Sequence, residues 1–152
     1  SFVSSGRGVF PSSLVQARLD ELKDYTPLAK GTMLRNQGSI KVQQDGGSWE
    51  IYKWAEPGHT YIVSGDAAGG GRSKDDDYSC VQVFDRVTEE QVAEFYAKVP
   101  PDRLADEMAM ASKLYNNAMV APECNGPGLV TIHELMTKHP ECTIYRRFSQ
   151  PG

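Results

Sequence analysis

Two carboxylates stand where predicted β-strands end, and glycines follow each of them. Asp66 ends the β-rich run 61–66, and Glu123 ends the β-rich run 118–123. A single acid at a strand end most often caps a turn. Two of them, each before a glycine loop, predict a shared site, provided that the two strands are parallel neighbours and their ends meet at one edge of a sheet.

Oxygen ligands of this kind suit Mg²⁺ or Mn²⁺. Two such ions, about 3.5–4 Å apart, activate water and stabilise the leaving oxygen of a phosphodiester. The run Asp75–Asp77 is most simply a solvated loop. Within it, Asp77 is the best additional ligand, because it directly precedes the next strand.

Several other kinds of site do not fit. The glycine loop lacks the Lys-Ser/Thr of a phosphate-binding P-loop, and Cys80 stands where an EF-hand loop needs glycine. No Gly-x-Ser-x-Gly elbow or Cys/His pair supports a covalent nucleophile. The three cysteines show no paired spacing, so we expect buried free thiols and no zinc site.

Composition limits the class of protein. The 152 residues, 39% hydrophobic and 24% charged, suit one soluble globular domain. No apolar run approaches the ~20 residues that span a bilayer, so we expect no membrane segment. The formal net charge of -4 argues against a protein that coats nucleic acid, but not against an enzyme that meets DNA through a metal-loaded acidic site.

The elements that would position the two acids form a mixed α/β pattern. Strands 61–66, 79–85 and 91–99 predict an antiparallel meander, because short turns join the second and third. A helix from Pro100 to Asn117, the strand 118–123, a helix that Pro140 ends, and a strand 142–145 follow. The order β-β-β-α-β-α-β predicts a mixed sheet with helices on its faces.

The first part of the chain has a different pattern. We expect a short helix that ends near Tyr25, then a hairpin of 40–44 and 48–53 around Asp45-Gly46-Gly47. On this basis residues 1–58 form a connecting region, and residues 59–152 form the α/β domain.

Taken together, several segments resemble the nuclease domain of the large terminase subunit of tailed bacteriophages. These segments are Tyr-Ile-Val-Ser-Gly-Asp-Ala-Ala-Gly-Gly (61–70), Asp-Tyr-Ser-Cys-Val-Gln-Val-Phe-Asp (77–85), Gln-Val-Ala-Glu-Phe (91–95), Leu-Tyr-Asn-Asn-Ala (114–118) and Ala-Pro-Glu-Cys-Asn-Gly-Pro-Gly (121–128). The opening Ser-Gly-Arg-Gly-Val-Phe-Pro (5–11) resembles the segment that joins the ATPase motor of that protein to its nuclease.

The resemblance implies a ribonuclease H-like fold. It implies a nuclease that cuts concatemeric double-stranded viral DNA during genome packaging, in the cytoplasm of a bacterial host. It implies that Asp66 and Glu123 hold two Mg²⁺ or Mn²⁺ ions and that Asp77 is an auxiliary acid. A third metal-binding acid is expected beyond the fifth strand, so the nuclease domain is expected to be truncated at its C-terminus. Arg72, Lys74 and Asn125 are expected to contact DNA, and the portal protein and the small terminase subunit are the expected partners.

Two other functions stay open. Phosphotransferases of the actin and sugar-kinase type also begin with a strand, an Asp, a glycine loop and a hairpin, and they bind ATP. They normally need a second Asp-x-Gly loop, where this chain has Glu123-Cys124-Asn125-Gly126. The other alternative is a non-catalytic ribonuclease H-like docking module.

Overall fold

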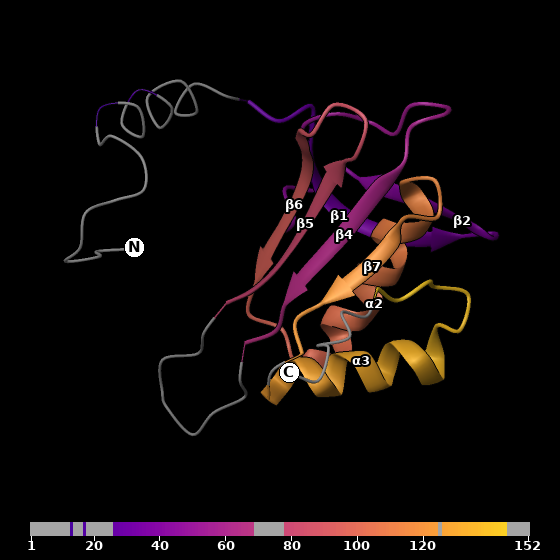
Figure 1. Cartoon of the computed structure of the whole chain (residues 1–152). Helices are drawn as coiled ribbons and strands as arrows, with labels where there is room; N and C mark the ends of the chain where they lie inside the picture. Colours follow the sequence, from indigo (N-terminus) through magenta and orange to yellow (C-terminus); the bar gives the residue numbers. More distant parts are fainter. Residues whose placement is uncertain (1–12, 14–16, 18–25, 69–77, 125, 146–152) are drawn as a thin grey trace.

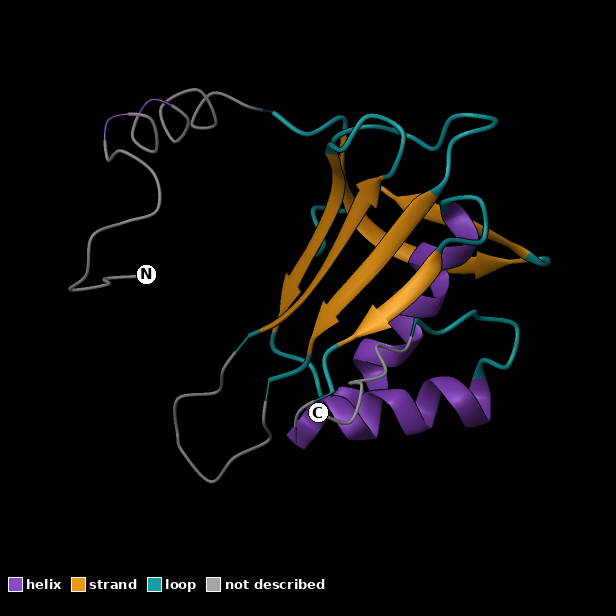
Figure 2. Ribbon diagram, in the orientation of Figure 1, coloured by secondary structure: helices purple, strands orange, loops and turns teal. Residues whose placement is uncertain are grey.

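The computed structural model describes residues 13, 17, 26–68, 78–124 and 126–145, which build one mixed sheet and two helices (Figures 1 and 2). The seven strands lie in the order β2-β1-β3-β6-β5-β4-β7. The strands are β1 Ala29–Asn36, β2 Ser39–Gln43, β3 Trp49–Ile51, β4 Tyr61–Asp66, β5 Ser79–Asp85, β6 Gln91–Ala97 and β7 Met119–Pro122, and the helices are α2 Pro101–Leu114 and α3 Gly126–Lys138.

The predicted α/β fold is confirmed in its central part. Strands β4, β5 and β6 form an antiparallel meander, and β7 pairs with β4 in parallel. Helix α2 connects β6 to β7 behind the sheet in the view of Figure 1, and α3 runs across the lower end. Helix α2 ends where predicted, because Asn116 and Asn117 both adopt the left-handed conformation at φ 59° and 55°.

The core lies between the sheet and α2. Side chains alternate along β4 and β5, so one face of the sheet is buried while the other is partly open. The residues whose spacing predicted an apolar helix face are buried: Leu104, Met108 and Ala111 on α2, and Tyr115 at its C-cap. No helix of the described residues covers the open face, which points toward the viewer in Figure 1.

The carboxyl group of Glu107 lies inside this core. The carboxylate of Glu107 on α2 accepts hydrogen bonds from Trp49 Nε1 at 2.7 Å and from Arg103 Nη2 at 3.2 Å. Burial raises the pKa of Glu107, and the bonds from Trp49 and Arg103 oppose that shift. The bond from Trp49 ties β3 to α2.

The predicted fifth strand is reduced to one bridge among the described residues. Ile144 bridges Val120 in parallel, and the amides of Val120 and Tyr145 make the two hydrogen bonds, at 2.8 and 2.7 Å. The segment therefore lies beside β7, as the sequence predicts.

The predicted hairpin of 40–44 with 48–53 is wrong. The two segments do not pair with each other. Each pairs instead with strand β1, which the sequence analysis missed: β2 pairs with the second half of β1, and β3 pairs with its first half. The hairpin turn is Gln37-Gly38, with φ values of 47° and 82° that suit a two-residue primed turn. The stronger turn signal, Asp45-Gly46-Gly47, instead leads from β2 to β3.

The strands on either side of residue 58 belong to the same sheet, since β3 pairs with β6. The helix expected before Tyr25 falls almost wholly outside the described residues. Where the chain is described, no helix is both long and apolar enough to cross a membrane.

Candidate metal centre

The ends of β4 and β7 are level with each other. In the parallel pairing Val63 lies opposite Val120, and Gly65 lies opposite Pro122. One residue further, the amide of Glu123 donates a hydrogen bond to the carbonyl oxygen of Gly65 at 3.0 Å. Asp66 and Glu123 therefore leave neighbouring strands at the same edge of the sheet, which is the condition the sequence analysis required.

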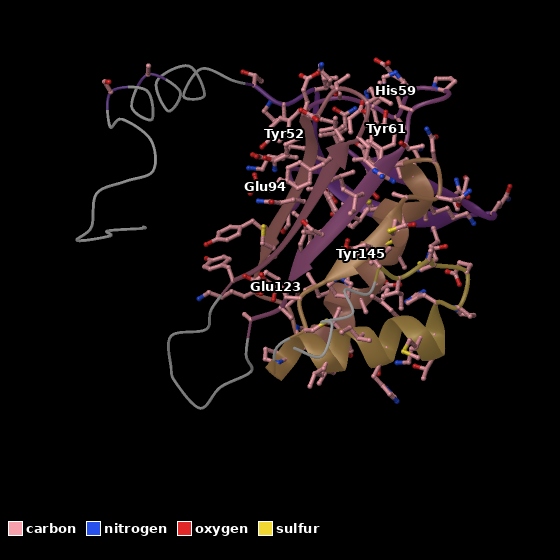
Figure 3. All side chains as sticks on the ribbon, in the orientation of Figure 1. Tyr52, His59, Tyr61, Glu94, Glu123 and Tyr145 are labelled. Carbon is pink, nitrogen blue, oxygen red and sulfur yellow. The ribbon has the colours of Figure 1, made fainter. Side chains whose placement is uncertain are left out.

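Both carboxylates line one small cavity on the open face. Its volume is about 240 Å³, and its lining residues come from β4, β5 and the end of β7: Ser64, Gly65, Asp66, Cys80, Gln82, Ala121 and Glu123. Asp66 lies directly opposite Cys80, and Ser64 lies opposite Gln82. The cavity thus brings together carboxylate, hydroxyl and amide oxygens. Figure 3 shows Glu123 at the lower end of the sheet.

The cavity rests on tight packing against α2. Gly65 is buried between Asp66 and Ser64, and a Cβ added to it would lie 2.4 Å from Met108 Sδ and 2.6 Å from Met108 Cε. Glycine at this position lets α2 approach the strand just before the candidate ligand.

Cys80 contributes a neutral group to the cavity. Burial, with the charges of Glu94 and Asp66, raises the pKa of its thiol to about 11. All three cysteines are free, as expected, but the expectation of burial is wrong: Cys80 and Cys142 are half-buried and Cys124 is exposed. Cys80 lies in β5, which has one partly open face, and Cys142 lies in a bend two residues before the bridge at Ile144. An apolar sequence context reveals neither position.

The oxygen donors suit a hard divalent cation, but the described residues contain no group of three or more His, Cys, Asp and Glu side chains arranged to hold one. Asp66 and Glu123 are two carboxylates around one cavity. The other candidates from the sequence lie outside the described residues, namely Asp77, Arg72, Lys74 and Asn125.

Sequence analysis did not assign Gln82 or Cys80 to the site. Ser64 shares a face with Asp66 through simple alternation along one strand. Gln82 and Cys80 enter only through the register of β5 against β4. That register depends on where pairing resumes after a loop of a dozen residues, and no turn signal in the loop fixes it.

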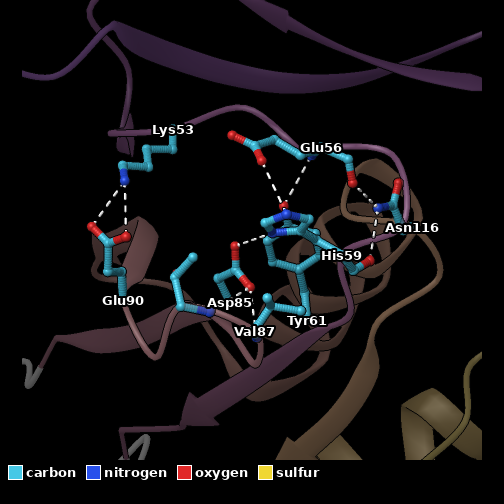
Figure 4. A network of polar contacts seen from close by, with 9 residues as sticks. Lys53, Glu56, His59, Tyr61, Asp85, Val87, Glu90 and Asn116 are labelled. Atoms are coloured by element: carbon cyan, nitrogen blue, oxygen red, sulfur yellow. Dashed lines mark hydrogen bonds and ion pairs between the residues drawn. The ribbon is translucent and has the colours of Figure 1, made fainter.

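A separate polar network closes the opposite end of the sheet (Figure 4). His59 Nδ1 lies 2.7 Å from Asp85 Oδ2, and His59 Nε2 lies 3.1 Å from Glu56 Oε2. The hydrogen bond with Asp85 raises the pKa of His59. Burial alone would raise the pKa of Asp85, but the bonds from His59, Val87 N–H and Thr88 N–H lower it overall.

This network fastens the loop that leads into β4. Asn116 Nδ2 donates to the carbonyl oxygens of Glu56 and His59, at 2.9 and 3.0 Å. Tyr61 Oη accepts a hydrogen bond from the amide of Glu56 at 2.9 Å. Figure 3 shows His59 and Glu123 at opposite ends of the sheet, so the network holds β4 from the end remote from the cavity.

No family model and no curated protein matches the chain. Among solved structures, the large terminase nuclease from thermophilic phage G20c matches with a TM-score of 0.53 at 18% identity, over 80% of this chain and 55% of that one. The structure of that nuclease with bound magnesium matches with a TM-score of 0.52 at 20% identity, over 83% of this chain and 58% of that one. The structure with bound zinc matches with a TM-score of 0.51 at 20% identity, over 80% of this chain and 61% of that one.

The chain therefore spans little more than half the length of these solved chains. At 18–20% identity the likeness is one of fold. The chain has the ribonuclease H-like α/β fold of the large terminase nuclease.

Proposed function

We propose that this chain is the metal-dependent endonuclease part of a viral terminase large subunit. The observation that carries the proposal is that Asp66 and Glu123 line one cavity at the level ends of two parallel strands. The fold shared with a terminase nuclease supports the same reaction class, although fold alone does not assign chemistry.

In this proposal Asp66 and Glu123 hold two Mg²⁺ or Mn²⁺ ions, and Asp77 is an auxiliary acid. When bound, such ions activate water and neutralise the charge that develops on a phosphodiester. Glu123 is oriented by the bond from its amide to Gly65. Ser64 and Gln82 present neutral hydrogen-bonding groups to the same cavity, where they can bind water or a phosphate oxygen without adding charge.

The proposed substrate is concatemeric double-stranded DNA, with Arg72, Lys74 and Asn125 contacting the strand that is cut. Residues 1–58 would connect this nuclease to an ATPase motor, and a third acid would come from chain beyond this sequence. The proposed partners are the portal protein and the small terminase subunit, and the proposed location is the cytoplasm of a bacterial host. The magnesium bound in the G20c nuclease supports a divalent ion, not its identity here.

The test combines metal binding with cleavage. Calorimetric titration of the chain with Mn²⁺ should detect binding that Asp66→Asn and Glu123→Gln each remove, and the same variants should abolish plasmid nicking by the terminase subunit that contains the chain. Glu141→Gln is the matched control, because Glu141 is an exposed acid that does not line this cavity. Unchanged nicking by Asp66→Asn would disprove the proposal. An affinity for Mn²⁺ weaker than about 1 mM would favour a non-catalytic docking module.

A further inference from the structure

A second and larger cavity lies on the same open face. Its volume is about 490 Å³, and it is lined by Lys30, Gly46, Gly47, Ser48, Glu50, Glu94 and Tyr96. We call it the Tyr96 pocket. Glu94 lies opposite Gln82, and Tyr96 lies opposite Cys80, so the two cavities are one strand apart. Asp66 on β4 and Tyr96 on β6 are separated by two strand spacings, because β5 lies between them. That distance is roughly 10 Å, which a nucleic-acid strand covers in about three nucleotides.

One wall of the Tyr96 pocket is a fixed loop. The carboxylate of Asp45 accepts hydrogen bonds from Gly47 N–H at 2.9 Å and from Thr32 Oγ1 at 3.0 Å. The amide of Gly46 donates to the carbonyl oxygen of Lys30 at 3.1 Å. A Cβ at Gly47 would lie 2.5 Å from Thr32 Oγ1, so the loop packs too closely for a larger residue. The wall is formed before any ligand arrives.

Two carboxylates supply the acceptors. Glu50 and Glu94 are cross-strand partners on β3 and β6, and the hydroxyl of Tyr52 lies 2.9 Å from Glu50 Oε2 and 3.3 Å from Glu94 Oε2. Burial and the two carboxylates raise the pKa of Tyr52, so its hydroxyl keeps its proton and donates. One proton cannot satisfy both carboxylates, so acceptor capacity remains. Figure 3 shows Tyr52 and Glu94 together beside β6.

An exposed ring completes the pocket. Tyr96 is 57% exposed, and Tyr78 stacks on it with ring centroids 4.4 Å apart and planes 7° apart. Lys98 Nζ lies 5.2 Å from the centroid of the Tyr78 ring. Tyr96 is thus held in place by its neighbours although most of it faces solvent, which is the arrangement of an aromatic platform for a flat ligand.

We propose that the Tyr96 pocket binds an unpaired nucleobase that carries an exocyclic amino group, with guanine as the best match. The carboxylates repel phosphate and accept N–H donors, so the base enters rather than the backbone. Guanine presents a ring N–H beside its amino group, and one carboxylate can accept from both. The ring stacks on Tyr96, and Lys30 at the rim, 3.9 Å from Glu50, lies where it can offset phosphate charge.

This inference rests on the proposed nuclease function, since it names the base of the strand whose backbone would reach Asp66 and Glu123. An arginine side chain of a protein partner has a similar set of donors and also stacks on tyrosine. The open position of the pocket beside the candidate metal centre favours the nucleic acid.

The test measures binding without metal. Three labelled single-stranded oligonucleotides are compared by fluorescence anisotropy in EDTA: oligothymidine, the same strand with one central guanine, and the same strand with hypoxanthine, which lacks the amino group. The chain should bind the guanine strand roughly tenfold tighter than oligothymidine, within the range of one stacked base, and the hypoxanthine strand should fall between them.

For the variants, the measured quantity is the ratio of the affinity for the guanine strand to the affinity for oligothymidine. The ratio is used because removing any acid strengthens the binding of every nucleic acid. Glu94→Gln and Tyr96→Ala should abolish the preference for guanine, while Tyr96→Phe should keep it. Tyr145→Ala is the control, since Tyr145 is 50% exposed and lines neither cavity. Equal affinity for all three strands, or a preference intact in Glu94→Gln, would overturn the inference. So would stronger competition by methylguanidinium than by guanosine, which would indicate an arginine. Failure of the proposed function shows separately, as nicking that survives Asp66→Asn.

Discussion

The amide of Glu123 donates a hydrogen bond to the carbonyl oxygen of Gly65, 3.0 Å away, one residue beyond the end of β7. This bond carries the parallel pairing past the last strand residue and holds the two acids level. Because strand side chains alternate, a slip of one residue would turn Glu123 or Asp66 to the other face. The candidate site therefore depends on register as much as on the acids themselves.

Gly65→Ala should destabilise the chain and move Met108. The added methyl would lie 2.4 Å from Met108 Sδ, so the thioether must shift within a close-packed core. We expect a loss of about 1–3 kcal/mol in the free energy of unfolding, measured with urea. Met108→Ala in the same chain should recover part of the loss, as a double-mutant cycle shows. Gly126→Ala is the control, since nothing lies within 4 Å of its added Cβ. A loss in the control as large as in Gly65→Ala would contradict this account.

Trp49→Phe should cost about 1–3 kcal/mol, because it leaves a buried carboxylate of Glu107 without its shortest donor. Burial already raises the pKa of Glu107, and loss of the donor should raise it further. The loss should thus be smallest at acid pH, where Glu107 is protonated in both folded and unfolded chains, and largest at neutral pH. Thermal unfolding at several pH values measures it. Trp54→Phe, at a ring 43% exposed, should have little effect at any pH.

The His59–Asp85 pair should stabilise the chain most between mildly acid and neutral pH. The raised pKa of His59 gives stability that is present below its ordinary value of 6.5 and is lost as pH rises through the folded value. The lowered pKa of Asp85 gives stability that is present above 3.8 and is lost as pH falls through the folded value. His59→Asn should flatten the melting temperature against pH over both ranges. A profile parallel to that of the unchanged chain would contradict the pair, and His133→Asn, at an exposed histidine, is the control.

Cys80 should react slowly with iodoacetamide at neutral pH, because burial and the nearby carboxylates raise its pKa to about 11 and little thiolate is present. Exposed Cys124 should be modified first, as peptide mass spectrometry of timed samples shows. Glu94→Gln removes the larger of the two charge effects and should speed alkylation of Cys80. Equal rates at Cys80 and Cys124 in the unchanged chain would contradict the raised pKa.

The central fold follows from signals that are local in the sequence. Apolar spacing gives α2, alternation gives β4 and β5, and the two asparagines end the helix where they should. Strand β1 was missed because Gly31 and Thr32 dilute its alternation. Gly31 is there for close packing, since its added Cβ would lie 1.8 Å from the carbonyl oxygen of Gln43. Asp45-Gly46-Gly47 does form a turn between β2 and β3, but this turn lines the Tyr96 pocket and does not join two paired strands of a hairpin.

The residues of the candidate site also differ in whether the sequence alone reveals them. Asp66 and Glu123 are visible in sequence because each ends a strand before glycines. Their neighbours are not, because Gln82 and Cys80 meet Asp66 and Ser64 only across a pairing register. The Tyr96 pocket needs residues from three strands and a loop, and the pairing of β3 with β6 brings them together. Long-range pairing of that kind leaves no periodic trace in the chain.

The pairing of β3 with β6 has a practical consequence for work with shorter pieces. A chain beginning at residue 59 would lack β3, and β6 would present its unpaired N–H and C=O groups as a sheet edge, with Phe95 no longer covered by Trp49. Exposed edges of that kind join other chains. Such a piece should self-associate more readily than the longer chain, because residues 28–51 supply the strand that covers this edge.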